Sequence, residues 1–264
     1  MTIIEALLLG LIQGLTEFLP VSSSGHLVIF QDLLGMNEPG VTLEIILHFG
    51  TLFSVIWVFR KDFFDLFAFI NDKRQRHFLL MLLIGTIVTA LIGLLFRGYV
   101  DYLFQSTLVV GFMLIVTGVI LKLITTIKTG EKEIIEMNIK DAALVGLLQG
   151  LAIMPGISRS GSTILASLWC GLDRNSAIKY SFMLSAPVIL GATILETRDL
   201  FLAGLDREMI IYYVAGGLVA FISGIFAIKT FIRLLTQSKF YYFSYYCWAV
   251  GSLVIIISLL RILK

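Results

Sequence analysis

The chain has 264 residues, of which 58% are hydrophobic and only 14% are charged. A soluble domain of this size could not bury so much apolar surface, so a soluble protein is excluded and the lipid bilayer is the expected solvent. The net charge of +2 excludes a basic surface of the kind that binds nucleic acid. The long apolar runs fit helices better than barrel strands, which predicts an all-α polytopic membrane protein.

The chain begins with an apolar stretch, residues 2–19, that no basic segment precedes, so we expect no cleaved signal peptide. This stretch ends in the polar break Pro20-Val21-Ser22-Ser23-Ser24-Gly25-His26, and a short apolar run follows at about 27–35. We predict a re-entrant helical hairpin that enters the membrane and leaves it on the same side. Three runs long enough to cross the bilayer come next, at about 41–59, 78–96 and 106–124.

The second half repeats this order. A polar segment, residues 128–140, is the expected cytoplasmic linker between the halves. Residues 142–154 end in the second break, Pro155-Gly156-Ile157-Ser158-Arg159-Ser160-Gly161, which predicts another re-entrant hairpin with its return at about 163–172. The last spans are predicted at about 181–197, 210–229 and 242–260, so the chain should have six full transmembrane helices and two hairpins.

The two halves share a sequence repeat. Residues 5–25 and 141–161 match at ten of 21 positions, without a gap, at a constant offset of 136 residues. Three spans separate the copies and reverse the second copy in the membrane. Residues 1–127 and 141–264 are therefore predicted to form an inverted-topology repeat within one membrane domain, an arrangement that places ligand sites where the copies meet.

The loops differ in their content of Lys and Arg. The predicted topology puts fourteen of these residues on one side and five on the other. Because cytoplasmic loops are enriched in Lys and Arg, the first side is cytoplasmic and both termini should lie outside a bacterial inner membrane. Near the last span, five aromatic residues are interpreted as a belt at the membrane surface: Tyr241, Tyr242, Tyr245, Tyr246 and Trp248.

The two breaks carry different polar residues. The first half has an acid, a hydroxyl and an imidazole at Glu17, Ser23 and His26, where the second half has Ile153, Arg159 and Ser162. A charged side chain inside the membrane is costly, so Glu17 and Arg159 need partners. Either they form an internal salt bridge with each other, or they receive a charged ligand between the hairpins.

The second break has the composition of an anion site. Arg159 comes just before a helical run, where free backbone N–H groups, hydroxyls and a forked guanidinium match a phosphate. The alternative is a helix cap rich in Ser and Gly in which Arg159 reaches a carbonyl group. The residues predicted to bind phosphate are Ser22, Ser24, Gly156, Ser158, Arg159, Ser160 and Thr163.

The first hairpin carries the candidates for catalysis and metal binding. His26 follows Ser23 by three residues, and an imidazole takes a proton from a hydroxyl or water, or attacks phosphorus, although a lone histidine is often structural. Gln13 and Glu17 lie four residues apart on one helix face, so their oxygens suit Mg²⁺ or Ca²⁺ held against phosphates. On the first span, Glu44 and His48 form either an interfacial polar patch or a support for this site.

These motifs resemble a known family. The segment 13–26 resembles the first motif of the bacterial undecaprenyl-diphosphate phosphatases, also called bacitracin resistance proteins, and residues 155–163 match their PGxSRSxxT motif. The resemblance extends over essentially the whole chain. It implies hydrolysis of undecaprenyl diphosphate to undecaprenyl phosphate and inorganic phosphate, at a site open to the periplasm. This reaction recycles the lipid carrier for peptidoglycan synthesis and confers bacitracin resistance.

The resemblance also implies residue roles. It assigns catalysis to Glu17, Ser23, His26 and Arg159, with Mg²⁺ or Ca²⁺ as cofactor, and leaves open whether Ser23 or His26 is the nucleophile. Gln13 stands where the family often has glutamate, which weakens a two-carboxylate metal site. Because inverted repeats also occur in transporters, a lipid-phosphate flippase with the same anion site is the alternative function. The expected partners are a polyprenyl diphosphate lipid, membrane lipid and a second copy of the chain in a homodimer.

Overall fold

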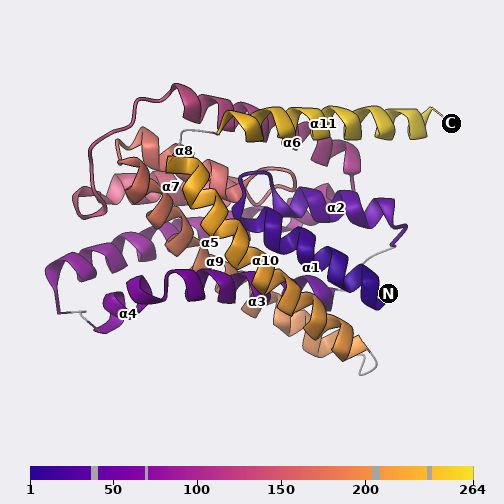
Figure 1. Cartoon of the computed structure of the whole chain (residues 1–264), viewed down its shortest axis with the longest axis horizontal. Helices are drawn as coiled ribbons and strands as arrows, with labels where there is room; N and C mark the ends of the chain where they lie inside the picture. The colour runs from indigo at the N-terminus through magenta and orange to yellow at the C-terminus, as the bar shows by residue number, and fades with distance from the viewer. Residues whose placement is uncertain (37–40, 69–70, 204–208, 237–239, 264) are drawn as a thin grey trace.

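The structure, a computed structural model, describes residues 1–36, 41–68, 71–203, 209–236 and 240–263. Within these ranges the only β-type pairing is an isolated bridge between Lys132 and Leu172, which confirms the all-α fold class (Figure 1). The helices are α1 Ile3–Phe18, α2 Ser23–Leu33, α3 Val41–Val58, α4 Arg60–Ala68, α5 Lys73–Phe104, α6 Thr107–Thr126, the 3₁₀ turn η1 Ile134–Glu136, α7 Ile139–Leu151, α8 Arg159–Trp169, α9 Arg174–Ala203, α10 Ile210–Thr236 and α11 Tyr241–Ile262.

Within the described ranges, five helices are long and apolar enough to cross a bilayer, as a multi-pass membrane protein requires. The predicted span at 41–59 corresponds to α3, which qualifies only together with α4, and these two helices meet at a bend of 75°. Counting this bent pair as one span gives six among the described residues. The five qualifying segments are Lys73–Phe96, Thr107–Thr126, Arg174–Leu195, Ile210–Leu234 and Tyr241–Ile262.

Helices α5 and α9 begin several residues before the predicted apolar runs. Each starts after an aspartate whose Oδ1 accepts a hydrogen bond from a first-turn amide. Asp72 accepts from the N–H of Arg74 at 2.8 Å, and Asp173 accepts from the N–H of Asn175 at 2.8 Å. Such caps satisfy amides that have no partner inside the helix, so a polar first turn is stable although its hydropathy does not reveal it.

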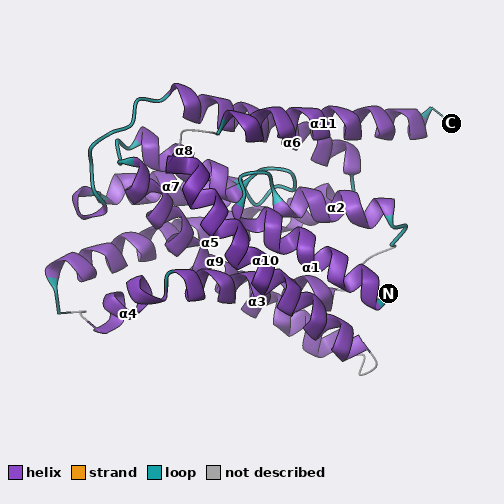
Figure 2. Ribbon diagram, in the orientation of Figure 1, coloured by secondary structure: helices purple, strands orange, loops and turns teal. Residues whose placement is uncertain are grey.

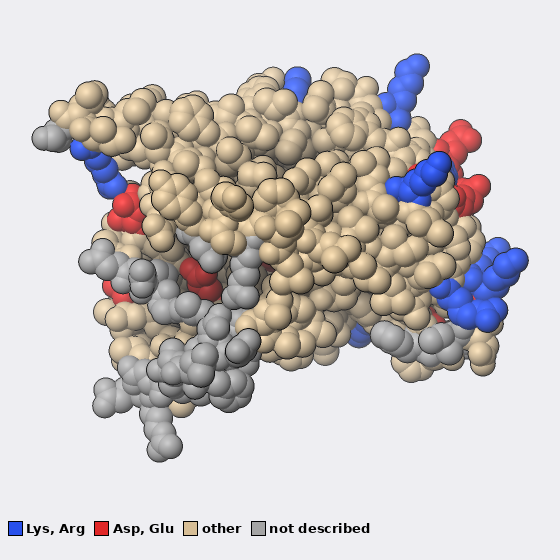
Figure 3. Space-filling model, turned by 180° about the vertical axis from the view of Figure 1, so that it is seen from behind, with Lys and Arg blue, Asp and Glu red and all other residues tan. Residues whose placement is uncertain are grey.

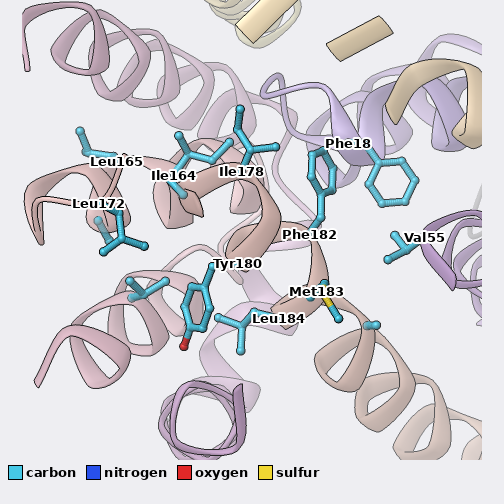
Figure 4. Close-up of a cluster of buried hydrophobic side chains, with 14 of the residues drawn as sticks. Phe18, Val55, Ile164, Leu165, Leu172, Ile178, Tyr180, Phe182, Met183 and Leu184 are labelled. Atoms are coloured by element: carbon cyan, nitrogen blue, oxygen red, sulfur yellow. The ribbon is translucent and has the colours of Figure 1, made fainter. Parts of the chain in front are cut away.

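The core gathers around α9, of which 56% of the membrane-length window is buried, against 22% for α11. Phe182 of α9 lies at the centre of this core (Figure 4). Its ring centroid lies 5.8 Å from that of Phe18 on α1 and 6.0 Å from that of Phe231 on α10. Because Phe18 follows Glu17 directly, this aromatic packing fixes the end of α1 that carries the acid.

The helix boundaries follow the offset of the sequence repeat, since α2 and α8 begin and end 136 residues apart. α1 packs against α10, and its counterpart α7 packs against α5. A glycine allows backbone contact in each pair. A Cβ on Gly10 would lie 2.3 Å from the carbonyl oxygen of Gly216, and one on Gly146 would lie 2.5 Å from that of Gly85. Gly10 and Gly146 are equivalent positions in the repeat, so both halves use the same close helix packing.

The ends of the molecule differ from its middle. The start of α1 and the end of α11 lie at the same end of the long axis (Figure 1). On the face seen in Figure 3, most charged side chains lie towards the two ends, and a broad surface without charge separates them. This distribution matches a molecule whose middle is embedded in lipid.

Gly10→Ala should destabilise the protein, although alanine is the better helix former by about 1 kcal/mol. The added Cβ would clash with backbone atoms of Gly216, and overpacking of this kind costs about 1–3 kcal/mol. The measurement is the midpoint of thermal unfolding in detergent. Gly191→Ala in α9 is the matched control, because nothing lies within 4 Å of a Cβ there. Its midpoint should stay unchanged or rise, and equal losses in both variants would contradict the close contact.

Candidate active site

Pro20 ends the first helix and opens the first break. Leu19 before it has an extended backbone with φ −65° and ψ 143°, because the proline ring disfavours a helical conformation in the preceding residue. The chain then turns at Ser22, whose φ of 69° is the one positive value at a non-glycine residue in the described ranges. Ser22 Oγ accepts a hydrogen bond from the N–H of Gly25 at 3.3 Å, so this serine caps the new helix α2.

The second break has the same cap at the equivalent position. Ser158 Oγ accepts a hydrogen bond from the N–H of Gly161 at 3.1 Å. Gly156 makes the turn before it with a φ of +95°, a conformation that favours glycine. Thr117 on α6 fixes this loop, because its hydroxyl donates to the carbonyl oxygen of Gly156 at 2.7 Å and accepts from the N–H of Ser158 at 3.0 Å.

The two breaks meet in the middle of the molecule (Figure 2). A Cβ on Gly25 would lie 2.9 Å from the Cα of Gly156, so the two backbones are in contact. α2 and α8 both start at this contact. The first two backbone amides of each helix donate no hydrogen bond to any described residue, and free amides at helix starts attract anions.

The carboxylate of Glu17 is the centre of this junction. One of its oxygens, Oε2, accepts hydrogen bonds from Ser23 Oγ at 2.6 Å and from Gln13 Nε2 at 3.0 Å. The other oxygen, Oε1, is paired with Nη2 of Arg159. A single buried carboxylate thus joins an amide and a hydroxyl from one half to the cation from the other.

The guanidinium of Arg159 is more open than its partner. Its side chain is 18% exposed, against 5% for Glu17. Apart from Glu17, the guanidinium has no hydrogen-bond partner among the described residues, so further N–H groups face the junction. One turn along α8, the hydroxyl of Thr163 lies 3.0 Å from the carbonyl oxygen of Arg159 and 2.5 Å from Ser181 Oγ, which holds the start of the helix in place. Of the two alternatives that the sequence left open, the ion pair between Glu17 and Arg159 forms, and it leaves donors of the guanidinium for an anion.

The serines of the two breaks have different surroundings. Ser22 and Ser158 act as helix caps and are buried. The hydroxyls of Ser24 and Ser160 each lie 3.3 Å from the capping hydroxyl of their own break. Ser23 differs from these four because its hydroxyl contacts the carboxylate directly, and its side chain is partly exposed.

His26 lies in the first turn of α2 and faces α11. Its Nδ1 lies 2.8 Å from the carbonyl oxygen of Ser22, and its Nε2 lies 2.7 Å from the hydroxyl of Tyr246. The two rings are nearly parallel, with planes 7° apart and centroids 5.6 Å apart. Among the described residues Ser23 has no hydrogen bond to His26, since its hydroxyl donates to Glu17.

Sequence patterns missed two residues of this site. Tyr246 belongs to the group interpreted as an aromatic belt, and Thr117 lies inside an apolar span. Their contacts join segments 220 and 39 residues apart in the chain. No local pattern distinguishes Tyr246 from its neighbour Tyr245, so only the fold reveals its contact with His26.

Glu44 and His48 lie on α3 beside the junction. Gln31 Nε2 donates a hydrogen bond to Glu44 Oε1 at 3.0 Å and so ties α2 to α3. His48 lies one turn further along α3, and its Nδ1 is 2.8 Å from the carbonyl oxygen of Glu44. Glu44 therefore contacts the helix that carries Ser23 and His26.

Gln13 and Glu17 are suited to a particular kind of metal site. The buried Oε1 of Gln13 has no hydrogen-bond partner among the described residues, and it lies on the side chain that also contacts the Glu17 carboxylate. Oxygen ligands of this type bind Mg²⁺ or Ca²⁺. No group of three or more His, Cys, Asp or Glu that could hold a metal occurs in the part of the chain that the structure describes. The pair fits an ion that takes its other ligands from water and phosphate.

Comparison with known proteins identifies one family. The family model described as bacitracin resistance protein BacA matches residues 6–253. A relative from Halothermothrix orenii is 48% identical and covers 98% of this chain and 99% of its own length. Relatives from Alkaliphilus metalliredigens (47%, covering 98% and 100%) and Methanobrevibacter smithii (41%, covering 96% and 97%) are similar. All three are named undecaprenyl-diphosphatase.

Glu17 and Arg159 should be strongly coupled in a double-mutant cycle. Glu17→Gln or Arg159→Gln alone leaves a buried charge without its partner, whereas the double variant removes both charges. We expect a coupling free energy of about 0.5–3 kcal/mol, measured by unfolding in mixed detergent micelles. The more exposed pair of Asp62 and Lys179 is the control, with an expected coupling of about 0–1 kcal/mol. Equal coupling in both pairs would contradict a buried ion pair.

Proposed function

Because the chain belongs to the bacitracin resistance protein BacA family, we propose that it hydrolyses undecaprenyl diphosphate to undecaprenyl phosphate and inorganic phosphate where α1, α2 and α8 meet. The protein is a membrane hydrolase that recycles the lipid carrier of cell-wall synthesis and confers bacitracin resistance. The observation that carries the choice of site is the buried carboxylate of Glu17, which contacts both Ser23 and Arg159.

The reaction begins when the diphosphate enters this junction. The terminal phosphate lies against the Arg159 guanidinium and the free amides at the starts of α2 and α8, which offset the charge that develops in the transition state. The rest of the proposed phosphate site consists of the residues of the two breaks that the sequence predicts to bind phosphate, namely Ser22, Ser24, Gly156, Ser158, Ser160 and Thr163.

Ser23 is the nucleophile in this mechanism. Its Oγ attacks the terminal phosphorus and passes its proton to Oε2 of Glu17, 2.6 Å away. The bond between that phosphorus and the bridging oxygen breaks, and undecaprenyl phosphate leaves with the electron pair. Water then attacks the seryl phosphate, and the bond between Ser23 Oγ and phosphorus breaks. Inorganic phosphate leaves, and Ser23 Oγ takes its proton back from Glu17.

His26 is the base that accepts a proton from this water. The competing mechanism, in which His26 itself attacks phosphorus, would trap phosphate on nitrogen. Phosphohistidine is labile in acid whereas phosphoserine is stable, so acid treatment of quenched enzyme distinguishes the two. The hydrogen bond between Ser23 and Glu17 supports the serine mechanism.

The two re-entrant hairpins and the inverted repeat are part of the proposal. The matching boundaries of α2 and α8, the equivalent serine caps and the paired packing of α1 on α10 and α7 on α5 support two related halves, 1–127 and 141–264, joined by 128–140. In this arrangement the hairpins enter from opposite sides of the membrane and bring the two breaks together at its interior.

The site is proposed to open to the periplasm, with both termini outside. The excess of Lys and Arg, fourteen against five, on the opposite loops supports this orientation. The start of α1 and the end of α11 lie at one end of the molecule, which supports placing both termini on the same side of the membrane (Figure 1). A homodimer stays a prediction from sequence.

A hydrolase is favoured over a lipid-phosphate flippase because the relatives are named as diphosphatases. A flippase would use the anion site without needing Ser23 or His26. Detergent micelles separate the two activities, since micelles have no compartments between which a lipid could move. Lipid movement in vesicles without phosphate release in detergent would establish the flippase.

Purified protein in detergent should release inorganic phosphate from undecaprenyl diphosphate, and Arg159→Lys should lower the rate about 100-fold. A lysine supplies a point charge but not the fork of donors that contacts carboxylate and phosphate together. Arg261→Lys is the matched control, because Arg261 is exposed and pairs with Asp32 at the end of α11. Near-normal release by both Arg159→Lys and Arg159→Ala would rule out the proposed phosphate site.

Mg²⁺ or Ca²⁺ is the proposed cofactor, held by Gln13 Oε1 and Glu17, where it would neutralise charge on the diphosphate. Chelation should abolish phosphate release. Gln13→Leu should raise the Mg²⁺ concentration for half-maximal activity about tenfold. Gln149→Leu is the control, because Gln149 is the repeat counterpart, has an equally unpaired buried Oε1, and bonds to Thr89 instead of a carboxylate. An identical metal dependence in both variants would remove Gln13 from the site.

A further inference from the structure

One side chain beside the site has a contact that the proposed reaction does not explain. Tyr246 on α11 is 44% exposed, yet its hydroxyl lies 2.7 Å from Nε2 of the buried His26. Its ring is also nearly parallel to the imidazole, with planes 7° and centroids 5.6 Å apart. An aromatic residue that served only to contact lipid headgroups would need neither interaction.

The partners of His26 determine which nitrogen carries the proton. The carbonyl oxygen of Ser22, 2.8 Å from Nδ1, is only an acceptor, so Nδ1 bears the hydrogen. In the neutral ring Nε2 is then the basic nitrogen, and the phenol of Tyr246 donates to it. Tyr246 therefore occupies the one atom of His26 that is able to accept a proton.

We propose that Tyr246 is a positioning residue for the reaction: it orients the imidazole of His26, keeps its basic nitrogen at Nε2, and releases that nitrogen to the attacking water. This inference rests on the proposed function. No atom is exchanged with Tyr246, whose phenol gives up one hydrogen bond to Nε2 while the water takes its place. The water's proton moves to Nε2 as its oxygen bonds to phosphorus.

The Tyr246 phenol is able to leave His26 without disturbing the packing of α11. The ring is almost half exposed, and the structure gives its hydroxyl no partner other than His26 among the described residues. The neighbouring Cys247 is fully buried and anchors α11, with its Sγ 4.0 Å from the carbonyl oxygen of Pro20 in the first break. Helix α11 thus holds a fixed position beside the break while the side chain of Tyr246 turns away.

Tyr246→Phe tests the hydroxyl alone, because it keeps the aromatic ring beside His26. Loss of one hydrogen bond should lower kcat about 3- to 10-fold and leave KM for undecaprenyl diphosphate unchanged. In a His26→Ala background the same change should have no further effect, since Tyr246 acts through His26. Tyr245→Phe is the matched control on the same helix, because Tyr245 is 55% exposed and its ring contacts Trp248 and Lys122.

A spectroscopic measurement tests the contact without turnover. The chain has three histidines, so nitrogen-15 NMR of the histidine-labelled protein gives few signals, and the His26 signals are those lost in His26→Gln. The Nε2 resonance of His26 should move in Tyr246→Phe and stay in place in Tyr245→Phe. An unchanged resonance together with a normal kcat would overturn the inference. The inference would also be overturned if Tyr246→Phe lowered kcat by the same factor in the wild-type protein and in the His26→Ala background.

The experiments distinguish a failure of the proposed hydrolase function from a failure of the inference about Tyr246. A wild-type protein that releases no phosphate would refute the hydrolase, whereas the NMR comparison would still decide whether Tyr246 controls the His26 ring. A normal wild-type rate with no effect of Tyr246→Phe in either measurement would refute the inference about Tyr246 and leave the hydrolase intact.

Discussion

An ion pair buried among membrane helices is the constraint on which the rest of the site depends. A charged side chain in the bilayer interior costs about 2.5–3.5 kcal/mol or more, and Glu17 and Arg159 reduce this cost by pairing across the two halves of the chain. They meet only because two helices break at the same place. At this place the backbones of Gly25 and Gly156 are in contact. Thr117 forms hydrogen bonds with the carbonyl oxygen of Gly156 and the N–H of Ser158, which the second break leaves without helical partners. The turn residues of both motifs are thus consequences of placing one acid beside one cation.

The repeat explains how one backbone arrangement yields two different half-sites. Ser22 and Ser158 cap their helices in the same way, and the side chain four residues later returns to the carbonyl oxygen of the cap in each half. In the first half this side chain is His26, which uses Nδ1, and in the second it is Ser162, which uses its hydroxyl. Both side chains contact the carbonyl oxygen of the capping serine, but only His26 has a further polar atom that points away from this contact. Only the imidazole has a second nitrogen to offer, so the chemistry lies in one half and the cation in the other.

The positions of the two breaks and their relation to each other could be predicted from sequence, because the residues that cause a break lie next to it in the chain. Proline, glycine and capping serines mark both breaks, and the constant offset of the repeat indicates that the breaks are related. Contacts between segments that are distant in the chain could not be predicted from such local patterns. A spacing of three residues favoured His26 as the partner of Ser23, but the side chain of Glu17, six residues before it, reaches the hydroxyl across the break. The contact between His26 and Tyr246 spans 220 residues. The bend after α3 falls where the apolar run ends, just before Arg60, so hydropathy marks the end of the span but not the helix that continues at an angle beyond it.

The ion pair also bears on the order of events in the proposed reaction. With Arg159 paired to Oε1 and two donors on Oε2, the carboxylate of Glu17 is well stabilised as an anion and is a weak base. A diphosphate carries more charge than a carboxylate and offers oxygens in the geometry that a guanidinium fork matches, so it competes for Arg159. A carboxylate that shares its cation with phosphate attracts a proton more strongly, and the nearest proton is that of Ser23, at 2.6 Å. Substrate binding would then itself activate the nucleophile, and the resting pair would protect Ser23 from reacting before the phosphate arrives.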